Sequence, residues 1–168
     1  MRGAGRARAV GKRQNPTVVR NFTPHDQDAV EELVLDGLRE RWGDSFDTSY
    51  NPDLADIDGH YLAKGAEVLV VEVDAQIVAA GALVLEGRDR GRVVRMSVAA
   101  SHRRRGLART VVEELIRRAR ERGLSELHVS TDTPWISAVA LYRSCGFEEV
   151  GQDDTDTHFS MDLRGASP

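Results

Sequence analysis

The chain has little of several residue types, and each shortage narrows what it can be. A single cysteine in 168 residues, Cys145, excludes a disulfide framework and fits a reducing compartment. No apolar run approaches the roughly 18 residues of a membrane span, and no signal-peptide core is present, so we expect a cytoplasmic protein with no membrane partner. The five histidines lack the spacing of metal ligands, so we expect no metal.

Positive charge gathers at the start of the chain. The net charge is −4, and the first 15 residues contribute five cations and no acid, so the remainder stands near −9. A body of that charge lacks the clustered cations that neutralise phosphates, so we expect no nucleic-acid partner. The segment 1–15 has no apolar periodicity and is predicted to be a disordered basic tail. An inert extension, a nucleic-acid-binding arm and a targeting segment all fit it.

The remaining residues, 16–165, are long enough for one domain with a real core. Their apolar patterns predict a mixed α/β domain. Strands are expected at 18–20, 68–73, 77–85, 93–98 and 127–130, with a last strand pair ending near 163. Helices are expected at 26–42, 107–122 and 137–145, with a short helix near 53–62.

The most informative segment joins the expected strand at 93–98 to the following helix. A helix N-terminus disfavours cations by roughly 0.3–1 kcal/mol each. Nevertheless Arg103, Arg104 and Arg105 come just before this helix, and Arg109 lies in its first turn. Gly106 lets the backbone approach closely, and the unpaired N–H groups of a first turn are ready donors for phosphate oxygens. The pattern favours an anion-binding turn, and an arginine-rich surface loop is the alternative.

Two segments together resemble the GNAT superfamily of N-acetyltransferases. Arg103-x-x-Gly106-x-Ala108 is similar to the family signature Arg/Gln-x-x-Gly-x-Gly/Ala. Residues 138–147, Ala-Val-Ala-Leu-Tyr-Arg-Ser-Cys-Gly-Phe, are similar to its final motif, Ala-x-x-Leu-Tyr-x-x-x-Gly-Phe. The likeness covers roughly 17–164. It implies the acyl-CoA N-acyltransferase fold, a largely antiparallel sheet flanked by helices, in an acetyl-CoA-dependent N-acetyltransferase of the EC 2.3.1 type.

The resemblance also implies how acetyl-CoA, the acyl donor, would be held. The strand at 93–98 is expected to splay from its neighbour, and pantetheine would pair with backbone in the resulting slot. Backbone N–H groups at 104–109 would take the diphosphate, with arginine side chains assisting. The implied cofactor contacts are Met96, Val98, Ala99, Arg103, Arg104, Arg105, Gly106, Leu107, Ala108, Arg109, Trp135 and Tyr142. Trp135 stands where many relatives have an asparagine, and it packs either on pantetheine or in the core.

Two catalytic roles follow from the same resemblance. The backbone N–H of Val98 is the expected donor to the developing oxyanion. Tyr142 is the expected general acid, because a phenol, with a pKa near 10, can hydrogen-bond to or protonate a departing thiolate, whose pKa is near 8.5. From sequence position alone, Tyr142 is equally well a core tyrosine. Cys145 has no evident partner base, so we expect a structural cysteine.

The general base is less clear. Many relatives carry a glutamate early in the strand before the arginine loop, whereas residues 91–95 here contain no acid. Glu72 and Glu86 are the nearest candidates, and a water chain would also serve. Each glutamate also fits a solvated strand residue. The missing acid leaves open a CoA-binding sensor without turnover.

The acceptor is expected to meet residues 42–61. Five aspartates without a lysine or arginine in 43–63 would attract a cationic amine. Trp42, Phe46, Tyr50 and Tyr61 could line a pocket there, and a solvated acidic loop with aromatics tucked into the core is the alternative. The implied reaction is direct attack by a primary amine of a small molecule or peptide, in a ternary complex. A protein lysine or N-terminus is the alternative acceptor, and the resemblance allows a homodimer.

Overall fold

The computed structural model describes residues 16–165, and the predicted tail at 1–15 lies outside the described residues. The strands are β1 Val18–Asn21, β2 Glu67–Val73, β3 Gln76–Glu86, β4 Arg90–Val98, β5 Glu126–Asp132, β6 Glu148–Gln152 and β7 Asp156–Asp162. The α-helices are α1 Gln27–Trp42, α2 Ile57–His60, α3 Leu107–Glu121 and α4 Ile136–Ser144. This order of strands and helices is the one predicted from the apolar pattern.

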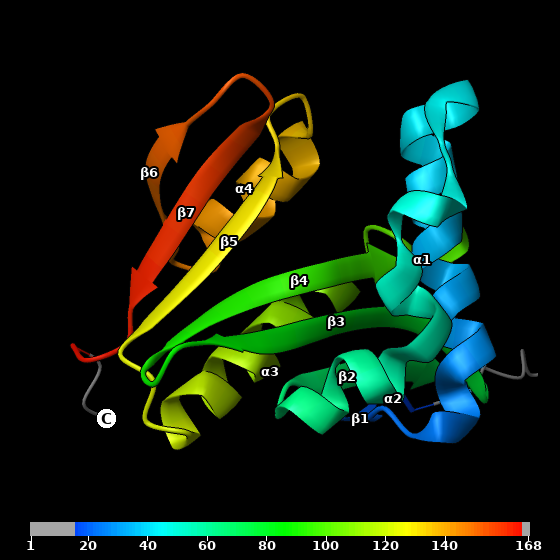
Figure 1. Cartoon of the computed structure of the whole chain (residues 1–168), viewed down its shortest axis with the longest axis horizontal. Helices are drawn as coiled ribbons and strands as arrows, with labels where there is room; N and C mark the ends of the chain where they lie inside the picture. The colour runs from blue at the N-terminus through cyan, green and yellow to red at the C-terminus, as the bar shows by residue number, and fades with distance from the viewer. Residues whose placement is uncertain (1–15, 166–168) are drawn as a thin grey trace, which may run out of the picture.

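The strands form one sheet in the order β1-β2-β3-β4-β5-β7-β6. Every neighbouring pair is antiparallel except β4 and β5, which are parallel. Figure 1 shows α1 and α2 on one side of the sheet, over β2 to β4, and α3 and α4 on the other side. The predicted mixed α/β fold, a largely antiparallel sheet flanked by helices, is confirmed.

The central strands supply two buried cores because successive side chains of a strand point to opposite faces. On β2, Leu69 and Val71 pack in the cluster that contains Leu115 of α3. The intervening Val70 packs in the other cluster, with Val34 of α1. The near-continuous apolar sequence of β2 therefore reflects burial on both faces.

The short helix expected at 53–62 is only partly helical. One α-helical turn, Ile57–His60, is flanked by 3₁₀ turns on both sides. Asp56 caps it by accepting the N–H of Gly59 (2.9 Å). Aspartate prefers such caps to helix interiors, so an aspartate-rich segment breaks into short turns.

The sheet splits where its two parallel strands meet. β4 pairs with β5 only at Arg90–Glu126, Gly91–Leu127 and Arg92–His128. The second half of β4 continues beside β3 alone, and Figure 1 shows β4 and β5 diverging from that point. The predicted splay is confirmed, and it exposes one backbone edge of β4 from residue 93 to residue 98.

A bulge in β4 lies within the splayed half. The β3–β4 register shifts between Ala80 and Ala82, and Arg95 adopts a φ of 56°, in the left-handed region. Gly81 faces this bulge, and a Cβ there would collide with the Met96 sulfur and lie 2.8 Å from a methyl of Val111. The missing side chain at Gly81 therefore makes room for the bulge.

Candidate active site

The start of α3 presents a row of backbone N–H groups without acceptors. Among the described residues, the first α3 donor to be satisfied is Thr110, which bonds the carbonyl of Gly106 (3.0 Å), and the N–H groups from Arg104 to Arg109 have no acceptor. Arg104 (φ 63°) and Gly106 (φ 79°) are both left-handed. Residues of this kind form concave nests of N–H groups that bind anions. The turn therefore suits a phosphate group.

Two of the four arginines near this turn hold other elements in place. The guanidinium of Arg103 donates to both carboxylate oxygens of Glu40 on α1 (2.7 and 2.6 Å) and to the carbonyl of Val98 (3.2 Å). Arg109 donates to the carbonyl (3.1 Å) and the hydroxyl (2.7 Å) of Ser144 at the end of α4. Arg103 thus ties α1 to the end of β4, and Arg109 ties α3 to α4.

Arg104 and Arg105 differ from these two. Both are exposed, and neither makes an ion pair or a side-chain hydrogen bond with another residue in 16–165. Unpaired cations at a helix N-terminus are unfavourable, and an anion bound between them would offset that cost. These two guanidinium groups are the ones placed to meet a phosphate.

One backbone N–H of β4, that of Val98, points into the gap between β4 and β5. Ala99 donates to the carbonyl of Val78 on β3 (2.8 Å), so the preceding Val98–Ala79 pair is of the type without hydrogen bonds. The Val98 N–H therefore points away from β3, toward the splay. Ala99 uses its N–H on β3 and its carbonyl on the His102 N–H (2.8 Å).

Tyr142 lies in the core behind the splay, on α4. Its ring, 5% exposed, packs edge-on against Phe147 and tilted against Phe159, with centroids 5.9 Å apart in both pairs. Burial raises the pKa of its phenol, and the positive charge of Arg41 partly opposes that rise. Tyr142 is therefore protonated at neutral pH, and its hydroxyl is available as a hydrogen-bond donor.

Arg41, near the end of α1, contacts residues at and just after the end of β5, a contact that was not predicted from the sequence. Its guanidinium bonds the carboxylate of Asp132 at the end of β5 (3.0 Å) and stacks on the ring of Trp135. Burial lowers the pKa of Arg41 to about 10 against the opposing effect of Asp132. The Nε of Arg41 is buried without a partner in the described region. Trp135 is thus packed against a cation.

The two glutamates predicted as base candidates lie away from Val98. Glu86 lies opposite Arg90 in the β3–β4 register, at the closed end of the splay. Arg90 is eight residues along β4 from Val98, so Glu86 lies roughly 26 Å from Val98. Glu72 is on β2, two strands from β4, where it accepts hydrogen bonds from Arg20 (3.2 and 3.0 Å). The geometry argues against both as the base.

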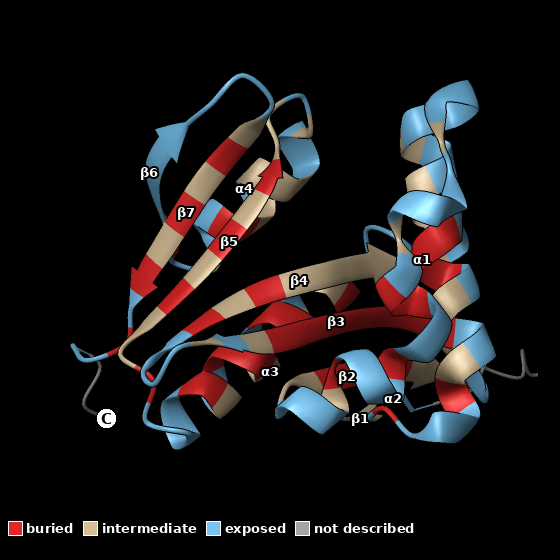
Figure 2. Cartoon of the chain, in the orientation of Figure 1, coloured by how far each residue is buried: buried red, intermediate tan, exposed pale blue. Residues whose placement is uncertain are grey.

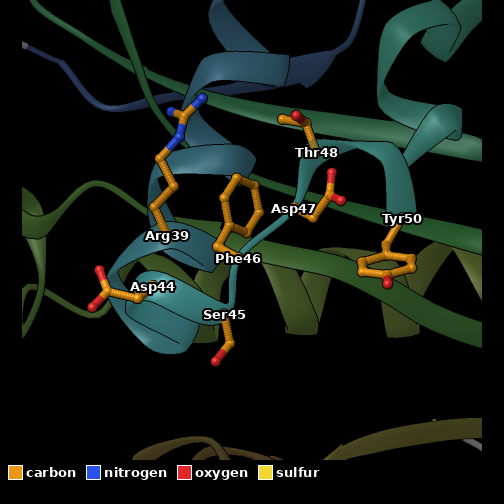
Figure 3. Close-up of a pocket in the computed structure, with 7 residues that line it drawn as sticks. All are labelled: Arg39, Asp44, Ser45, Phe46, Asp47, Thr48 and Tyr50. Atoms are coloured by element: carbon orange, nitrogen blue, oxygen red, sulfur yellow. The ribbon is translucent and has the colours of Figure 1, made fainter.

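An open hollow of about 590 Å³ lies at the end of α1. Its lining is Arg39, Asp44, Ser45, Phe46, Asp47, Thr48 and Tyr50. Figure 3 shows Arg39 beside the Phe46 ring, with Tyr50 on the far side of Asp47 and Thr48. Tyr50 (79% exposed) presents aromatic surface here, whereas Trp42 (48% exposed), the last residue of α1, does not line the hollow. Of the four predicted acceptor-binding aromatics, Phe46 and Tyr50 therefore line the hollow.

Tyr61, the fourth aromatic, is buried instead in a polar network that pins residues 51–61 to the β4 bulge. Its hydroxyl donates to Asp53 (2.5 Å), which also accepts two hydrogen bonds from Arg95 (2.9 and 2.6 Å). Arg95 donates further to Asn51 (2.8 Å). Burial and the bond to Asp53 raise the pKa of Tyr61 to about 12.

Asp53→Asn should destabilise the protein by about 3 kcal/mol, because it leaves the part-buried Arg95 without its anionic partner. Burial favours a higher pKa for Asp53, but the hydrogen bonds from Tyr61 and Arg95 outweigh it and lower that pKa. The carboxylate therefore stabilises the fold above the unfolded-state pKa of about 3.9, and this contribution is lost as the pH falls further. Urea unfolding between pH 3 and 7 measures it, with the exposed Asp58→Asn as control. Equal losses in both variants would contradict the assignment.

Other predicted features are found as follows. Cys145 is a part-buried free thiol, and burial raises its pKa. Within residues 16–165, no three His, Cys, Asp or Glu side chains are grouped to hold a metal ion. None of the helices in that range is long and apolar enough to cross a membrane.

Comparison with known proteins agrees with this geometry. The model of the acetyltransferase (GNAT) family matches residues 28–147. Human N-acetyltransferase 8 is 32% identical over 120 residues, which are 68% of this chain and 53% of that protein. This chain therefore spans about half the length of that relative.

Solved structures share the fold. A GNAT-family acetyltransferase from Staphylococcus aureus Mu50 superimposes with a TM-score of 0.81 at 18% identity, covering 89% of this chain and all of that one. The PaiA N-acetyltransferase from Thermoplasma acidophilum, solved in complex with coenzyme A, gives 0.74 at 11% identity, covering 88% and 99%.

Proposed function

The chain belongs to the acetyltransferase (GNAT) family, and we propose that it transfers the acetyl group of acetyl-CoA to a primary amine of a small molecule or peptide. Two features of the structure together support this proposal. One is the backbone edge of β4 that the splay exposes, and the other is the row of free N–H groups at the start of α3. A thioester linked through a long arm to a diphosphate needs both.

The residues at the start of α3 fit the diphosphate of acetyl-CoA, which supplies the activated acyl group. The free N–H groups from Arg104 to Arg109 bind its oxygens, and the side chains of Arg104 and Arg105 neutralise its charge. Arg103 holds the turn in place instead, because Glu40 binds its guanidinium and the carbonyl of Ala100 accepts its backbone N–H (3.5 Å). Met96 and Val98 offer backbone to pantetheine, whereas the N–H of Ala99 is already used on β3.

Val98 and Tyr142 then act on the two ends of the breaking bond. The N–H of Val98 donates to the thioester oxygen as negative charge develops there, a contribution worth several kcal/mol in a preorganised site. Tyr142 donates its proton, or a hydrogen bond, to the sulfur that leaves. Its ring is held between Phe147 and Phe159, so the hydroxyl is fixed in direction.

The acceptor approaches from the side of α1. Asp44 and Asp47 in the hollow attract a cationic amine, while Trp42, Phe46 and Tyr50 provide apolar contact. Tyr61 lies outside the hollow and, with Asp53 and Arg95, holds the segment that follows it against β4. An amine reaching the thioester from this side attacks while acetyl-CoA is bound, so both substrates occupy the protein together.

A panel of amines tests the proposal. Release of free CoA from acetyl-CoA is followed with a polyamine, simple alkylamines, α-amino acid amides and short lysine peptides, and the products are weighed by mass spectrometry. We expect one class of primary amine to gain 42 Da in step with CoA release. Tight acetyl-CoA binding without turnover of any amine would favour a sensor, and failure to bind CoA at low salt would overturn the proposal.

A further inference from the structure

One face of β5 and β7 carries a hydrogen-bonded chain of three polar side chains. Ser130 on β5 and His158 on β7 are directly opposed in the sheet. The Ser130 Oγ lies 2.8 Å from Nδ1 of His158, and Nε2 of His158 lies 2.8 Å from Oδ2 of Asp153, in the β6–β7 loop. A hydroxyl, an imidazole and a carboxylate thus form one continuous path for a proton.

The surroundings of Asp153 fix which nitrogen of His158 carries the proton. The other oxygen of Asp153 accepts the backbone N–H groups of Thr155 (2.9 Å) and Asp156 (2.7 Å). These two bonds, with that to His158, hold the pKa of Asp153 far below its usual range, so it remains a carboxylate. A carboxylate only accepts, so Nε2 of neutral His158 is the protonated nitrogen. Nδ1 is then the acceptor, and Ser130 donates to it.

These three side chains lie on β5, on β7 and in the loop before β7, on the side of the splay opposite β4. Ser130 is the next residue on the same face after His128, where the pairing with β4 ends. The intervening Val129 is buried on the opposite face. Figures 1 and 2 show no helix over this face of β5 and β7, with α1 and α2 over the β2–β4 half. Figure 2 shows buried and intermediate residues alternating along both strands, and Ser130 and His158 are among the intermediate ones. Ser130 is therefore reachable from the side from which the acceptor approaches.

We propose that Ser130 receives the proton of the acceptor ammonium and passes its own hydroxyl proton to Nδ1 of His158, which Asp153 orients. This inference rests on the proposed acetyltransferase function. The ammonium N–H bond breaks and an O–H bond forms on Ser130, while the former Ser130 proton forms the N–H bond on His158. The freed nitrogen lone pair forms the C–N bond to the thioester carbon, and the C–S bond breaks as Tyr142 protonates the departing sulfur. The attached nitrogen still carries one excess proton, which restores the Tyr142 hydroxyl, and the imidazolium releases its proton to water. Ser130 touches the substrate, whereas His158 and Asp153 act through it.

Other acids on this arm are less suited to the task. Asp132 is held in an ion pair with Arg41 (3.0 Å). Asp156 lies opposite Asp132, and burial followed by repulsion from Asp132 raises its pKa. Histidine is the side chain that exchanges protons near neutral pH. The charged and titratable groups facing His158 are Asp153, Asp156 on β7, Asp132 and His128 on β5, and Glu148 on β6.

The pH profile of His158→Gln tests the relay. In the wild type, kcat/KM for an alkylamine should rise with pH less steeply than in the variant, because the relay removes the ammonium proton. In the variant only amine that is already neutral reacts, so kcat/KM should keep rising toward the ammonium pKa of about 10. We expect a loss of about 30-fold at pH 7 that shrinks to less than about threefold at pH 10. Ser130→Ala should show the same shape.

A second acceptor sharpens the test. An α-amino group has a pKa of about 8, so the His158→Gln loss at pH 7 should be several-fold smaller with an amino acid amide than with an alkylamine. His128→Gln, on the same face of β5, should keep the wild-type profile. CoA binding and thermal unfolding check that each variant is folded.

Each outcome separates the relay from the reaction itself. A wild type that acetylates no amine would overturn the proposed function. An active wild type whose pH profile is unchanged in His158→Gln would overturn the relay alone. The relay would also fail if the profile moved in Asp156→Asn and stayed fixed in Ser130→Ala.

Discussion

Reversing the charges of Arg104 and Arg105 together, Arg104→Glu and Arg105→Glu, should weaken CoA binding about a hundredfold. Both side chains are exposed and unpaired within the described residues, so the change breaks no contact there. It replaces two attractions to the diphosphate by two repulsions, and each of these four contributions is worth roughly 0.7 kcal/mol between exposed charges. Together they amount to about 2.7 kcal/mol, a factor of about 100 in Kd. Calorimetric titration with CoA at 0.1 M salt measures it.

The matched control is Arg88→Glu with Arg90→Glu. These arginines are also exposed, and they lie at the β3–β4 connection, next to the segment that follows the last turn of α3 and thus at the opposite end of that helix from Arg104 and Arg105. The double variant carries the same change in net charge, so it isolates the long-range effect of charge. We expect its Kd to change less than about threefold, since salt screens charges beyond roughly 10 Å. Similar losses in both variants would mean that the diphosphate does not sit at the start of α3.

Tyr142→Phe should lower kcat by on the order of 300-fold while leaving the Kd for CoA nearly unchanged. The hydroxyl is the only atom removed, and the ring keeps its contacts with Phe147 and Phe159. Positioned acids contribute roughly 10²–10⁴ in rate. Because the hydroxyl acts on the departing sulfur, the loss belongs to the chemical step. Single-turnover measurements at saturating amine report that step directly.

Measurements made without an amine acceptor show whether Tyr142→Phe affects catalysis or only the packing of the core. Thermal unfolding and CoA titration of Tyr142→Phe should match the wild type closely. Replacing acetyl-CoA by a thioester of a more acidic thiol should reduce the loss, since a better leaving group needs less protonation. A variant that keeps wild-type kcat would show that Tyr142 is a core tyrosine, the alternative that its burial allows.

The fold and the anion-binding turn at 103–108 could be predicted from local sequence patterns. The apolar periodicity of α3 and the continuous apolar run of β2 are properties of short windows, so they are readable without the fold. The segment from Arg103 to Ala108 is likewise contiguous, and its excess of cations at a helix start is visible in the sequence alone.

Side chains that meet through the fold could not be predicted in this way. Arg41 and Asp132 are 91 residues apart, and their contact depends on how α1 crosses the end of the splay. The pairing of Arg103 with Glu40 depends on the same crossing. Nothing in an arginine signals the left-handed conformation of Arg95, although Gly81 opposite it is a hint that two backbones approach closely.

The Ser130–His158 pair falls between these cases. Alternation of polar and buried residues along β5 and β7 indicates that both side chains share one exposed face. Their partnership, however, depends on the register of two antiparallel strands, because a slip of one strand by one residue would place the two side chains on opposite faces of the sheet. The contact between Ser130 and His158 could therefore be identified only once the register of β5 and β7 was known.

A crystal structure with a non-transferable acetyl-CoA analogue would show whether the start of α3 and the splay hold the acyl donor. We expect diphosphate oxygens within hydrogen-bond distance, about 2.7–3.2 Å, of N–H groups between Arg104 and Arg109. We also expect the carbonyl oxygen of the acyl group on the N–H of Val98, with the thioester sulfur beside Tyr142. A diphosphate bound elsewhere, or an acyl group outside the splay between β4 and β5, would contradict this placement of the acyl donor.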